Sequence, residues 1–198
     1  MALRRQPLIA IILISVALVI VPLVLYMAQR ITGGYGLQPQ AQSIDFRWQA
    51  VDGDWHDFSD WHDGPTYLFM GFLSCSDICP LRIGQLMQLD TWLAEQEGAY
   101  DKSVRFLFIT IDPDTDTPSI REQLIDQRST RFVSARMQQA DLDKLQSILR
   151  EKITTQSGQL NHVGNLYLVS ENGTLARIYT QWQLSTQKML ADLTPLLK

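Results

Sequence analysis

Two uninterrupted apolar runs of strand length constrain the fold of this chain more than any other feature of its sequence. The runs are Tyr67–Leu73 and Val104–Ile111, and between them a helical pattern of apolar residues begins near Pro80. Strands that are apolar on both faces are typical of the centre of a sheet that is covered on both sides. Two such strands joined by a helix indicate a parallel crossover. The runs therefore predict an α/β fold with a central mixed sheet flanked by helices.

The residues around these strands predict the remaining elements. Asp52-Gly53 is a two-residue turn signal and predicts an N-terminal β-hairpin formed by 46–51 and 55–58. Thr117-Pro118 matches an N-cap followed by a proline at the first helical position, so we expect a helix from there to about Gln127. Further along, the sequence predicts a helix over 141–150, a hairpin formed by 165–170 and 175–180, and a final helix over 186–197 that Pro195 disturbs.

The first residues of the chain predict a membrane anchor. Residues 8–27 carry no charge, and about twenty helical residues span the hydrocarbon core of a bilayer. A cleaved signal peptide fits less well, because its apolar region is usually shorter and ends at a small-residue site. Arg4 and Arg5 precede the apolar run, so the positive-inside rule places the N-terminus in the cytoplasm. The predicted divisions are a cytoplasmic N-terminus over 1–7, a single-pass transmembrane anchor over 8–28, a flexible linker over 29–43 and a folded domain over 44–198.

This topology is typical of a bacterial inner-membrane protein whose C-terminal domain faces the oxidising periplasm. The predicted domain is acidic. Arg4, Arg5 and Arg30 are the only charged residues before Asp45, so residues 31–198 hold 14 of the 17 basic side chains and all 21 acidic ones, a net charge of −7. An acidic surface repels phosphate backbones, which argues against a nucleic-acid partner.

Cys75 and Cys79 are the only cysteines in the chain, and they lie between a predicted strand and the start of a predicted helix. A helix N-terminus favours anions and lowers the pKa of a thiol, which makes thiolate available for metal binding or disulfide exchange. A purely structural disulfide is a weaker interpretation, because so small a ring restrains little of the unfolded chain.

Histidines and one acidic turn supply further candidate residues. His162 directly precedes a predicted strand, in a loop position that is common for ligands and catalytic groups. His56 and His62 lie in the region of the first hairpin, where we expect exposed positions. Asp112 opens an acidic turn after the second apolar run, but this turn lacks the glycine and the closing glutamate of a calcium loop. Capping of the next helix explains most of its acidic residues.

In combination, three segments resemble the Sco/SenC family of copper-assembly proteins. They are GFLSCSDICP, with its Cys-x3-Cys-Pro motif, FITIDPDTDTP, with its Asp-Pro-x-x-Asp-Thr-Pro turn, and NHVGNLYLVSENGTL, with its histidine and hairpin. The resemblance covers roughly residues 44–182. It implies a thioredoxin-like fold that is tethered to a membrane by one N-terminal helix.

The resemblance also implies a function and a site. Cys75, Cys79 and His162 would bind one copper ion, as Cu(I) or Cu(II), and Asp112 would lie beside these ligands. Thiolates suit soft Cu(I), and an added imidazole lets the same site accept Cu(II). Family members assist assembly of the dinuclear copper centre of cytochrome c oxidase. The implied partners are the copper-site subunit of that oxidase or another copper protein, together with a thiol reductant.

The chain departs from the family pattern in two places. Asn161 stands where the family usually has an aspartate before its histidine, and the segment 128–160 lacks the expected glycine and aromatic pattern. Copper delivery, thiol reduction and copper sensing all stay open, as do the client, the copper affinity and the oligomeric state.

Two other functions compete with a copper carrier, which would not be an enzyme. A thiol-disulfide oxidoreductase would use Cys75 and Cys79 to reduce client cysteines. However, the spacing is not Cys-x-x-Cys, and no proline between Pro118 and Pro195 can supply the cis-proline of thioredoxins. A zinc site would need a fourth ligand, which only His56 or His62 could supply.

Overall fold

The computed structural model describes residues 11, 13–24, 34–96, 104–156 and 159–197. The chain divides into two compact units, Met1–Gly34 and Tyr35–Lys198. In the first unit, residues 11 and 13–24 are helical, and their large apolar side chains are exposed. The predicted cytoplasmic N-terminus over 1–7 lies outside the described residues. Both ends of the predicted anchor over 8–28 also lie outside them. Within the described residues, no helix has both the length and the apolar character needed to cross a membrane.

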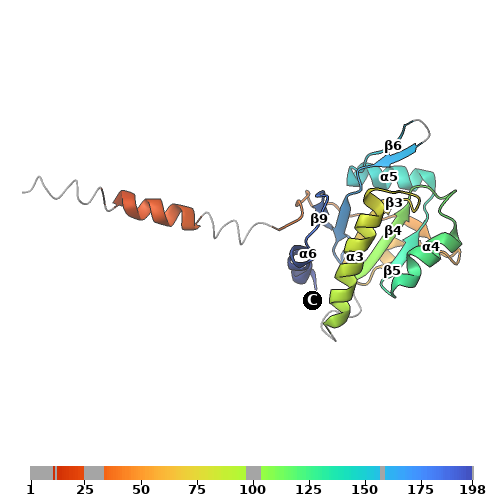
Figure 1. Cartoon of the computed structure of the whole chain (residues 1–198), viewed down its shortest axis with the longest axis horizontal. Helices are drawn as coiled ribbons and strands as arrows, with labels where there is room; N and C mark the ends of the chain where they lie inside the picture. Colours follow the sequence, from red (N-terminus) through yellow and green to blue (C-terminus); the bar gives the residue numbers. More distant parts are fainter. Residues whose placement is uncertain (1–10, 12, 25–33, 97–103, 157–158, 198) are drawn as a thin grey trace, which may run out of the picture. The chain divides into compact units, whose positions relative to one another are not determined.

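The second unit is built on a mixed five-stranded sheet with helices on both faces (Figure 1). The strand order is β5-β4-β3-β8-β9, in which β3, β4 and β5 are parallel and β8 and β9 are antiparallel to their neighbours. The sheet strands are β3 (Thr66–Gly71), β4 (Arg105–Thr110), β5 (Phe132–Ala135), β8 (Leu166–Val169) and β9 (Leu175–Tyr179). The helices are α2 (Phe58–Trp61), α3 (Ile78–Glu95), α4 (Pro118–Leu124), α5 (Gln139–Leu149) and α6 (Thr186–Leu193), with 3-10 turns at Asp126–Arg128 and Thr194–Leu196. The predicted α/β class and mixed central sheet are confirmed.

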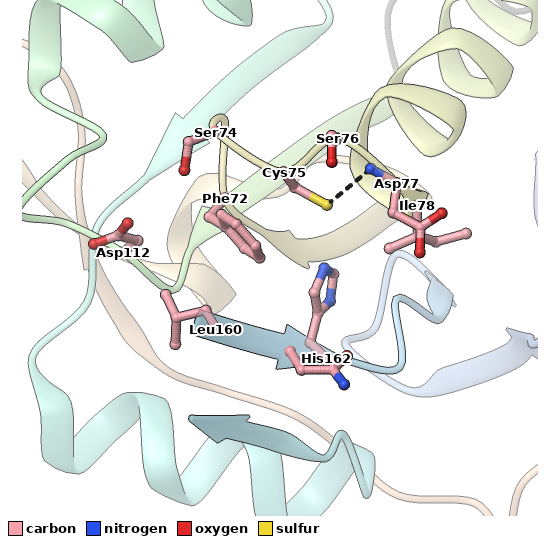
Figure 2. Close-up of a pocket in the computed structure, with 10 residues that line it drawn as sticks. Phe72, Ser74, Cys75, Ser76, Asp77, Ile78, Asp112, Leu160 and His162 are labelled. Atoms are coloured by element: carbon pink, nitrogen blue, oxygen red, sulfur yellow. Dashed lines mark hydrogen bonds between the residues drawn. The ribbon is translucent and has the colours of Figure 1, made fainter. Parts of the chain in front are cut away.

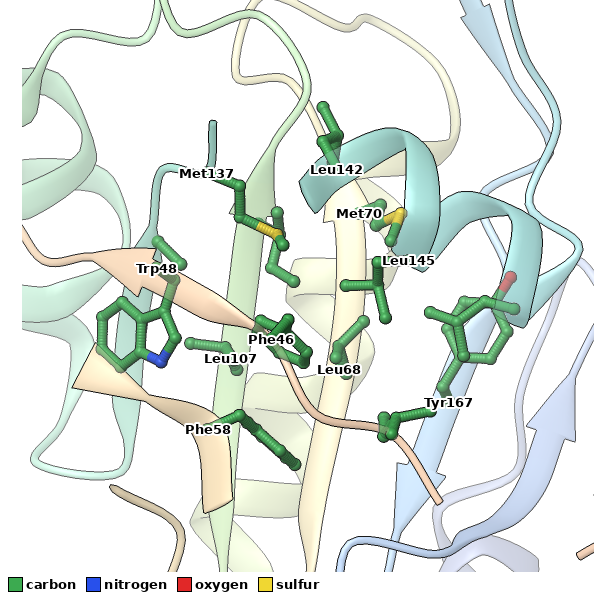
Figure 3. Packing of buried hydrophobic residues seen from close by; sticks show 14 of the residues in the cluster. Phe46, Trp48, Phe58, Leu68, Met70, Leu107, Met137, Leu142, Leu145 and Tyr167 are labelled. Atoms are coloured by element: carbon green, nitrogen blue, oxygen red, sulfur yellow. The ribbon is translucent and has the colours of Figure 1, made fainter. Parts of the chain in front are cut away.

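Alternating residues of the central strand explain why the sheet is covered on both faces. Tyr67 and Phe69 pack with the buried side chains of α3 and α6, whereas Leu68 and Met70 pack with those of α5. Figure 3 shows the second face, where α5 and the first hairpin enclose the sheet residues. Each face removes a separate apolar cluster from water, and such burial is the main favourable term in folding.

The direction of the strands brings three distant segments to one edge of the sheet. Because β3 and β4 are parallel, their carboxyl ends meet, and Gly71 pairs with Thr110. The strand β8 runs antiparallel to β3, so its first residue, Leu166, pairs with Phe69 near the same edge. The loops that follow β3 and β4 and the segment that precedes β8 therefore meet there. The region outside the carboxyl ends of parallel strands is a common place for a functional site in α/β sheets.

The hairpin and capping predictions are confirmed. The strands β1 (Arg47–Gln49) and β2 (Trp55–Asp57) pair antiparallel around Gly53, whose φ of 95° suits glycine. Thr117 caps α4 by accepting a hydrogen bond from the Ile120 N–H at 3.4 Å, and Pro118 is the first helical residue. The second predicted hairpin is formed by β8 and β9.

Three strands have no counterpart among the predicted elements. They are the edge strand β5 and the two strands of a separate hairpin, β6 (Ile153–Gln156) and β7 (Gln159–His162). The sequence predicts His162 in a loop, but it is the last residue of β7 and pairs with Ile153. Each of these strands is four residues long, which is too short for apolar periodicity to be clear.

Part of the predicted linker over 29–43 belongs to the folded unit, which begins at Tyr35 and not at residue 44. Leu37 exchanges backbone hydrogen bonds of 2.8 and 2.9 Å with Ile178 on the outer strand β9. The Tyr35 and Gly36 N–H groups donate to the Asp192 carboxylate at 3.0 and 2.8 Å. The segment has few apolar residues, and these hydrogen bonds, together with the Tyr35 ring packed 5.9 Å from the Tyr179 ring, hold it in place.

We predict that Asp192→Ala releases the segment that begins at Tyr35. Asp192 is buried, and it accepts two backbone hydrogen bonds and one from Arg177 at 3.3 Å. Loss of these charge-assisted bonds should lower the free energy of unfolding by about 2–4 kcal/mol. Denaturant unfolding and amide exchange at Leu37 measure the effect. The exposed Asp143→Ala is the control, and equal stability of the two variants would contradict this role.

Candidate metal centre

Three side chains able to bind a metal meet at the sheet edge described above. Cys75 lies in the loop after β3, Cys79 in the first turn of α3 and His162 at the end of β7. Their sulfur and nitrogen atoms all lie within 4.8 Å of one another, and Cys79 Sγ is 3.2 Å from His162 Nε2. Figure 2 shows the His162 ring pointing toward the Cys75 sulfur. The structure thus brings together the three candidate ligands of the sequence.

The loop between β3 and α3 wraps around Cys75. The Cys75 N–H donates to the Phe72 carbonyl at 3.3 Å. The Asp77 N–H donates to the Cys75 sulfur at 3.5 Å (Figure 2). The helix begins at Ile78, two residues before the predicted start at Pro80. Proline is tolerated there because the N–H groups of the first turn have no partner within the helix.

A glycine makes room for the second sulfur. A Cβ atom at Gly71, the last residue of β3, would lie 2.9 Å from Cys79 Sγ and 2.8 Å from the Phe69 ring. Any larger residue would therefore displace the thiol or the ring. The apolar strand ends in glycine because the first turn of α3 packs directly on it.

Burial raises the pKa of the Cys79 thiol far above its usual range, and the nearby Cys75 and Asp116 raise it further. The expectation of a lowered thiol pKa at the helix start is therefore wrong for Cys79. Only 1% of this residue is exposed, so loss of water around the sulfur outweighs the helix N-terminus. A bound cation reverses this balance, since a coordinating thiol is deprotonated.

The buried acid of the acidic turn is Asp116, not Asp112. Asp116 accepts hydrogen bonds from the Leu73 N–H at 3.1 Å and from the Thr110 hydroxyl at 2.7 Å, and burial raises its pKa. It therefore ties the turn after β4 to the cysteine loop. The Asp112 side chain lines the same cleft as Cys75 and His162, and in Figure 2 it lies on the far side of Phe72 from them.

A second buried acid lies behind His162. Glu151 accepts a hydrogen bond from the Gly164 N–H at 2.9 Å and another from the Tyr167 hydroxyl. Its Oε1 is 3.8 Å from His162 Nδ1, the ring nitrogen that faces away from Cys79. The sequence alone does not single out Glu151, because it lies just after α5 and shares no spacing motif with His162.

The other two histidines lie away from this centre. The His62 ring stacks on the Phe58 ring with ring centres 4.4 Å apart. The His56 ring packs on the Trp48 ring with ring centres 4.7 Å apart. Both residues are half-buried against these rings, which differs from the exposed positions expected of them. Among the described residues, the metal-binding group consists of Cys75, Cys79 and His162, with no fourth ligand from His56 or His62.

A cleft of about 430 Å³ gives access to the centre from the side of Cys75 and His162. Cys75 is half-buried at the cleft, whereas Cys79 and His162 are buried. Two soft sulfur donors and one imidazole suit copper in either oxidation state, and zinc also accepts such ligands. Structural zinc usually takes four protein ligands, so three donors argue against a structural zinc site.

Comparisons with known proteins show the family of this chain. The SCO1/SenC family model matches residues 36–198. A putative copper-binding protein of Stutzerimonas stutzeri is 26% identical over 147 residues, which cover 69% of this chain and 66% of that protein. The chain thus spans a little less than two thirds of that relative.

Solved structures share the fold. Arabidopsis thaliana ScoI with copper bound has a TM-score of 0.66 at 18% identity, over 77% of this chain and 98% of that one. BsSco, a member of the Sco family of cytochrome c oxidase assembly proteins in which a disulfide switch was identified, has a TM-score of 0.66 at 16% identity, over 83% and 96%. The predicted thioredoxin-like fold is confirmed by these likenesses. Since the family model covers the whole folded unit except its first residue, this chain belongs to the SCO1/SenC family.

Proposed function

We propose that this protein is a membrane-anchored periplasmic copper carrier, or metallochaperone, that assists assembly of the dinuclear copper centre of cytochrome c oxidase. The observation that carries the proposal is the convergence of Cys75, Cys79 and His162 within 4.8 Å, in a fold shared with copper-bound Sco structures. One copper ion is the cargo of this centre. The client follows from the family, whose member BsSco is described as an oxidase assembly protein.

The different burial of the ligands suits transfer of a metal. Cys79 and His162 are buried, whereas Cys75 is half-buried and lines the cleft. A thiol of the client can reach the cargo from the cleft and replace Cys75 first. Asp77 and Asp112 line the same cleft, and their negative charge favours the approach of a cation.

We predict that the reduced chain binds about one copper ion tightly and that His162→Ala weakens binding at least tenfold, because the variant lacks the imidazole donor. Anaerobic titration against a copper chelator measures the affinity. Absorption in the thiolate-to-copper charge-transfer region, recorded for the Cu(II) form, reports the ligands. Its bands should change in His162→Ala.

The matched control is His56→Ala, which removes a histidine that contacts Trp48 outside the centre. This variant should bind copper as the parent does. A His162→Ala variant with the affinity and spectrum of the parent would show that the three-ligand site is wrong, and a parent without copper uptake would reject the carrier function.

The anchor is supported by the sequence, in which Arg4 and Arg5 precede an uncharged run over residues 8–27. We predict that the chain stays in the membrane pellet after alkaline extraction, and that protease added outside spheroplasts digests its C-terminal domain. A chain that begins at residue 31 is the control and should be released. Extraction of the parent at alkaline pH would contradict an anchor.

A thiol-disulfide oxidoreductase is the second candidate, and the unequal exposure of the two thiols favours it. The Cys75 thiolate would attack a client disulfide and release one client thiol. Cys79 would then attack the mixed disulfide, which leaves a Cys75–Cys79 disulfide and a client reduced by two electrons. A periplasmic thiol reductant would restore the pair.

This division of roles predicts different reactivity of the two thiols. At pH 7, iodoacetamide should modify Cys75 at least tenfold faster than Cys79, because Cys79 is buried and the raised pKa keeps it protonated. Raising the pH increases the thiolate fraction of Cys79 only far above neutrality. Peptide mass spectrometry of the reduced chain measures both rates, and unfolded chain is the control. Equal rates in the folded chain would contradict the assignment of Cys75 as the attacking thiol.

A further inference from the structure

We propose that Glu151 is a positioning residue that presents His162 to the metal through its Nε2 atom. The inference rests on the proposed copper function and deepens it. Glu151 is 5% exposed, and its carboxylate lies on the opposite side of the imidazole from Cys79. The neighbouring Asn161 is exposed and cannot act as an acid.

The two nitrogens of the His162 ring face different groups. Nε2 lies 3.2 Å from Cys79 Sγ, on the side of the candidate ligands. Nδ1 is buried and has no hydrogen-bond partner within the described residues, and Glu151 Oε1 is 3.8 Å away from it. A neutral imidazole has one N–H, and its position follows the partner that the other nitrogen finds. The carboxylate therefore favours the proton on Nδ1, which leaves the Nε2 lone pair free for a metal.

Glu151 is itself held in place by both of its oxygens. Oε1 accepts from the Gly164 N–H at 2.9 Å, and Oε2 accepts from the Tyr167 hydroxyl. The Gly164 carbonyl in turn accepts from Arg82 Nε at 2.8 Å. The carboxylate is thus fixed between β8 and the segment that follows His162, on the Nδ1 side of the ring.

Gly164 fastens this arrangement to the cysteine helix. Its φ is +71°, and a Cβ atom there would lie 2.7 Å from Ile78, the residue before Cys79. Only glycine fits both the backbone conformation and the space. Glu151, His162 and Cys79 are therefore held in one rigid group, as carboxylate–histidine–metal arrangements require.

The test compares Glu151→Gln with Tyr167→Phe. The first variant keeps an oxygen for Gly164 but removes the negative charge, whereas the second removes a hydrogen bond to Glu151 and keeps the charge. If Glu151 positions His162, Glu151→Gln should weaken copper binding about 10- to 100-fold. Tyr167→Phe leaves the carboxylate beside the ring, so it should weaken copper binding less than Glu151→Gln does. Glu151→Asp keeps the negative charge but withdraws the carboxylate from the ring by one methylene, so this variant should bind copper with intermediate affinity.

A second readout needs no metal. Nitrogen-15 NMR of the reduced, metal-free chain at pH 8, above the ordinary imidazole pKa of about 6.5, reports which ring nitrogen of His162 carries the proton. The parent and Tyr167→Phe should carry it on Nδ1, and Glu151→Gln should shift it measurably toward Nε2. A parent that fails to bind copper rejects the carrier function, while the proton position still tests Glu151.

The proposal is overturned if Glu151→Gln leaves the proton position unchanged, or if Glu151→Gln binds copper as tightly as the parent. If Glu151→Gln does not fold, the same two measurements on Glu151→Asp decide the question, with a parent-like proton position and affinity counting against the proposal.

Discussion

The position of β3 between a parallel and an antiparallel neighbour is the constraint on which the rest of the molecule depends. It places the ends of two crossover strands and the start of a returning strand at one edge of the sheet. The cysteine loop, the turn with Asp116 and the segment with His162 meet there because the chain reverses direction at that point. The metal-binding group is therefore a consequence of topology, and short contacts only complete it.

Those contacts are close, and most of the side chains that make them are buried. Gly71 and Gly164 each allow an approach that a Cβ atom would block, one beneath Cys79 and the other against Ile78. Two buried acids flank the centre: Asp116 holds the cysteine loop and Glu151 stands behind the histidine. Buried carboxylates are costly unless they are hydrogen-bonded, and both are. The same burial keeps Cys79 protonated until a cation arrives, so uptake of metal and release of a proton are coupled.

The long apolar strands, the turns and the three candidate ligands could be predicted from the sequence, because each has a strong local signal. The apolar run Tyr67–Leu73 predicts a buried strand by itself, and Asp52-Gly53 predicts a turn. The strand β5 could not be predicted, since FVSA has no periodicity and owes its conformation to pairing with β4. The burial of Glu151 and Asp116 could not be predicted for a related reason. A buried acid becomes recognisable only when its partners, such as Tyr167 and Leu73, have been brought to it from elsewhere in the chain.

The hairpin of β6 and β7 has a consequence for the way changes elsewhere in the chain can reach the centre. By pairing His162 with Ile153, it brings the end of α5 next to the histidine, so Glu151 lies behind an imidazole that belongs to the other strand of the hairpin. The register of this short hairpin therefore sets the distance between the carboxylate and the ring. An insertion or deletion within β6 or β7 would separate the two groups while leaving both residues in the sequence.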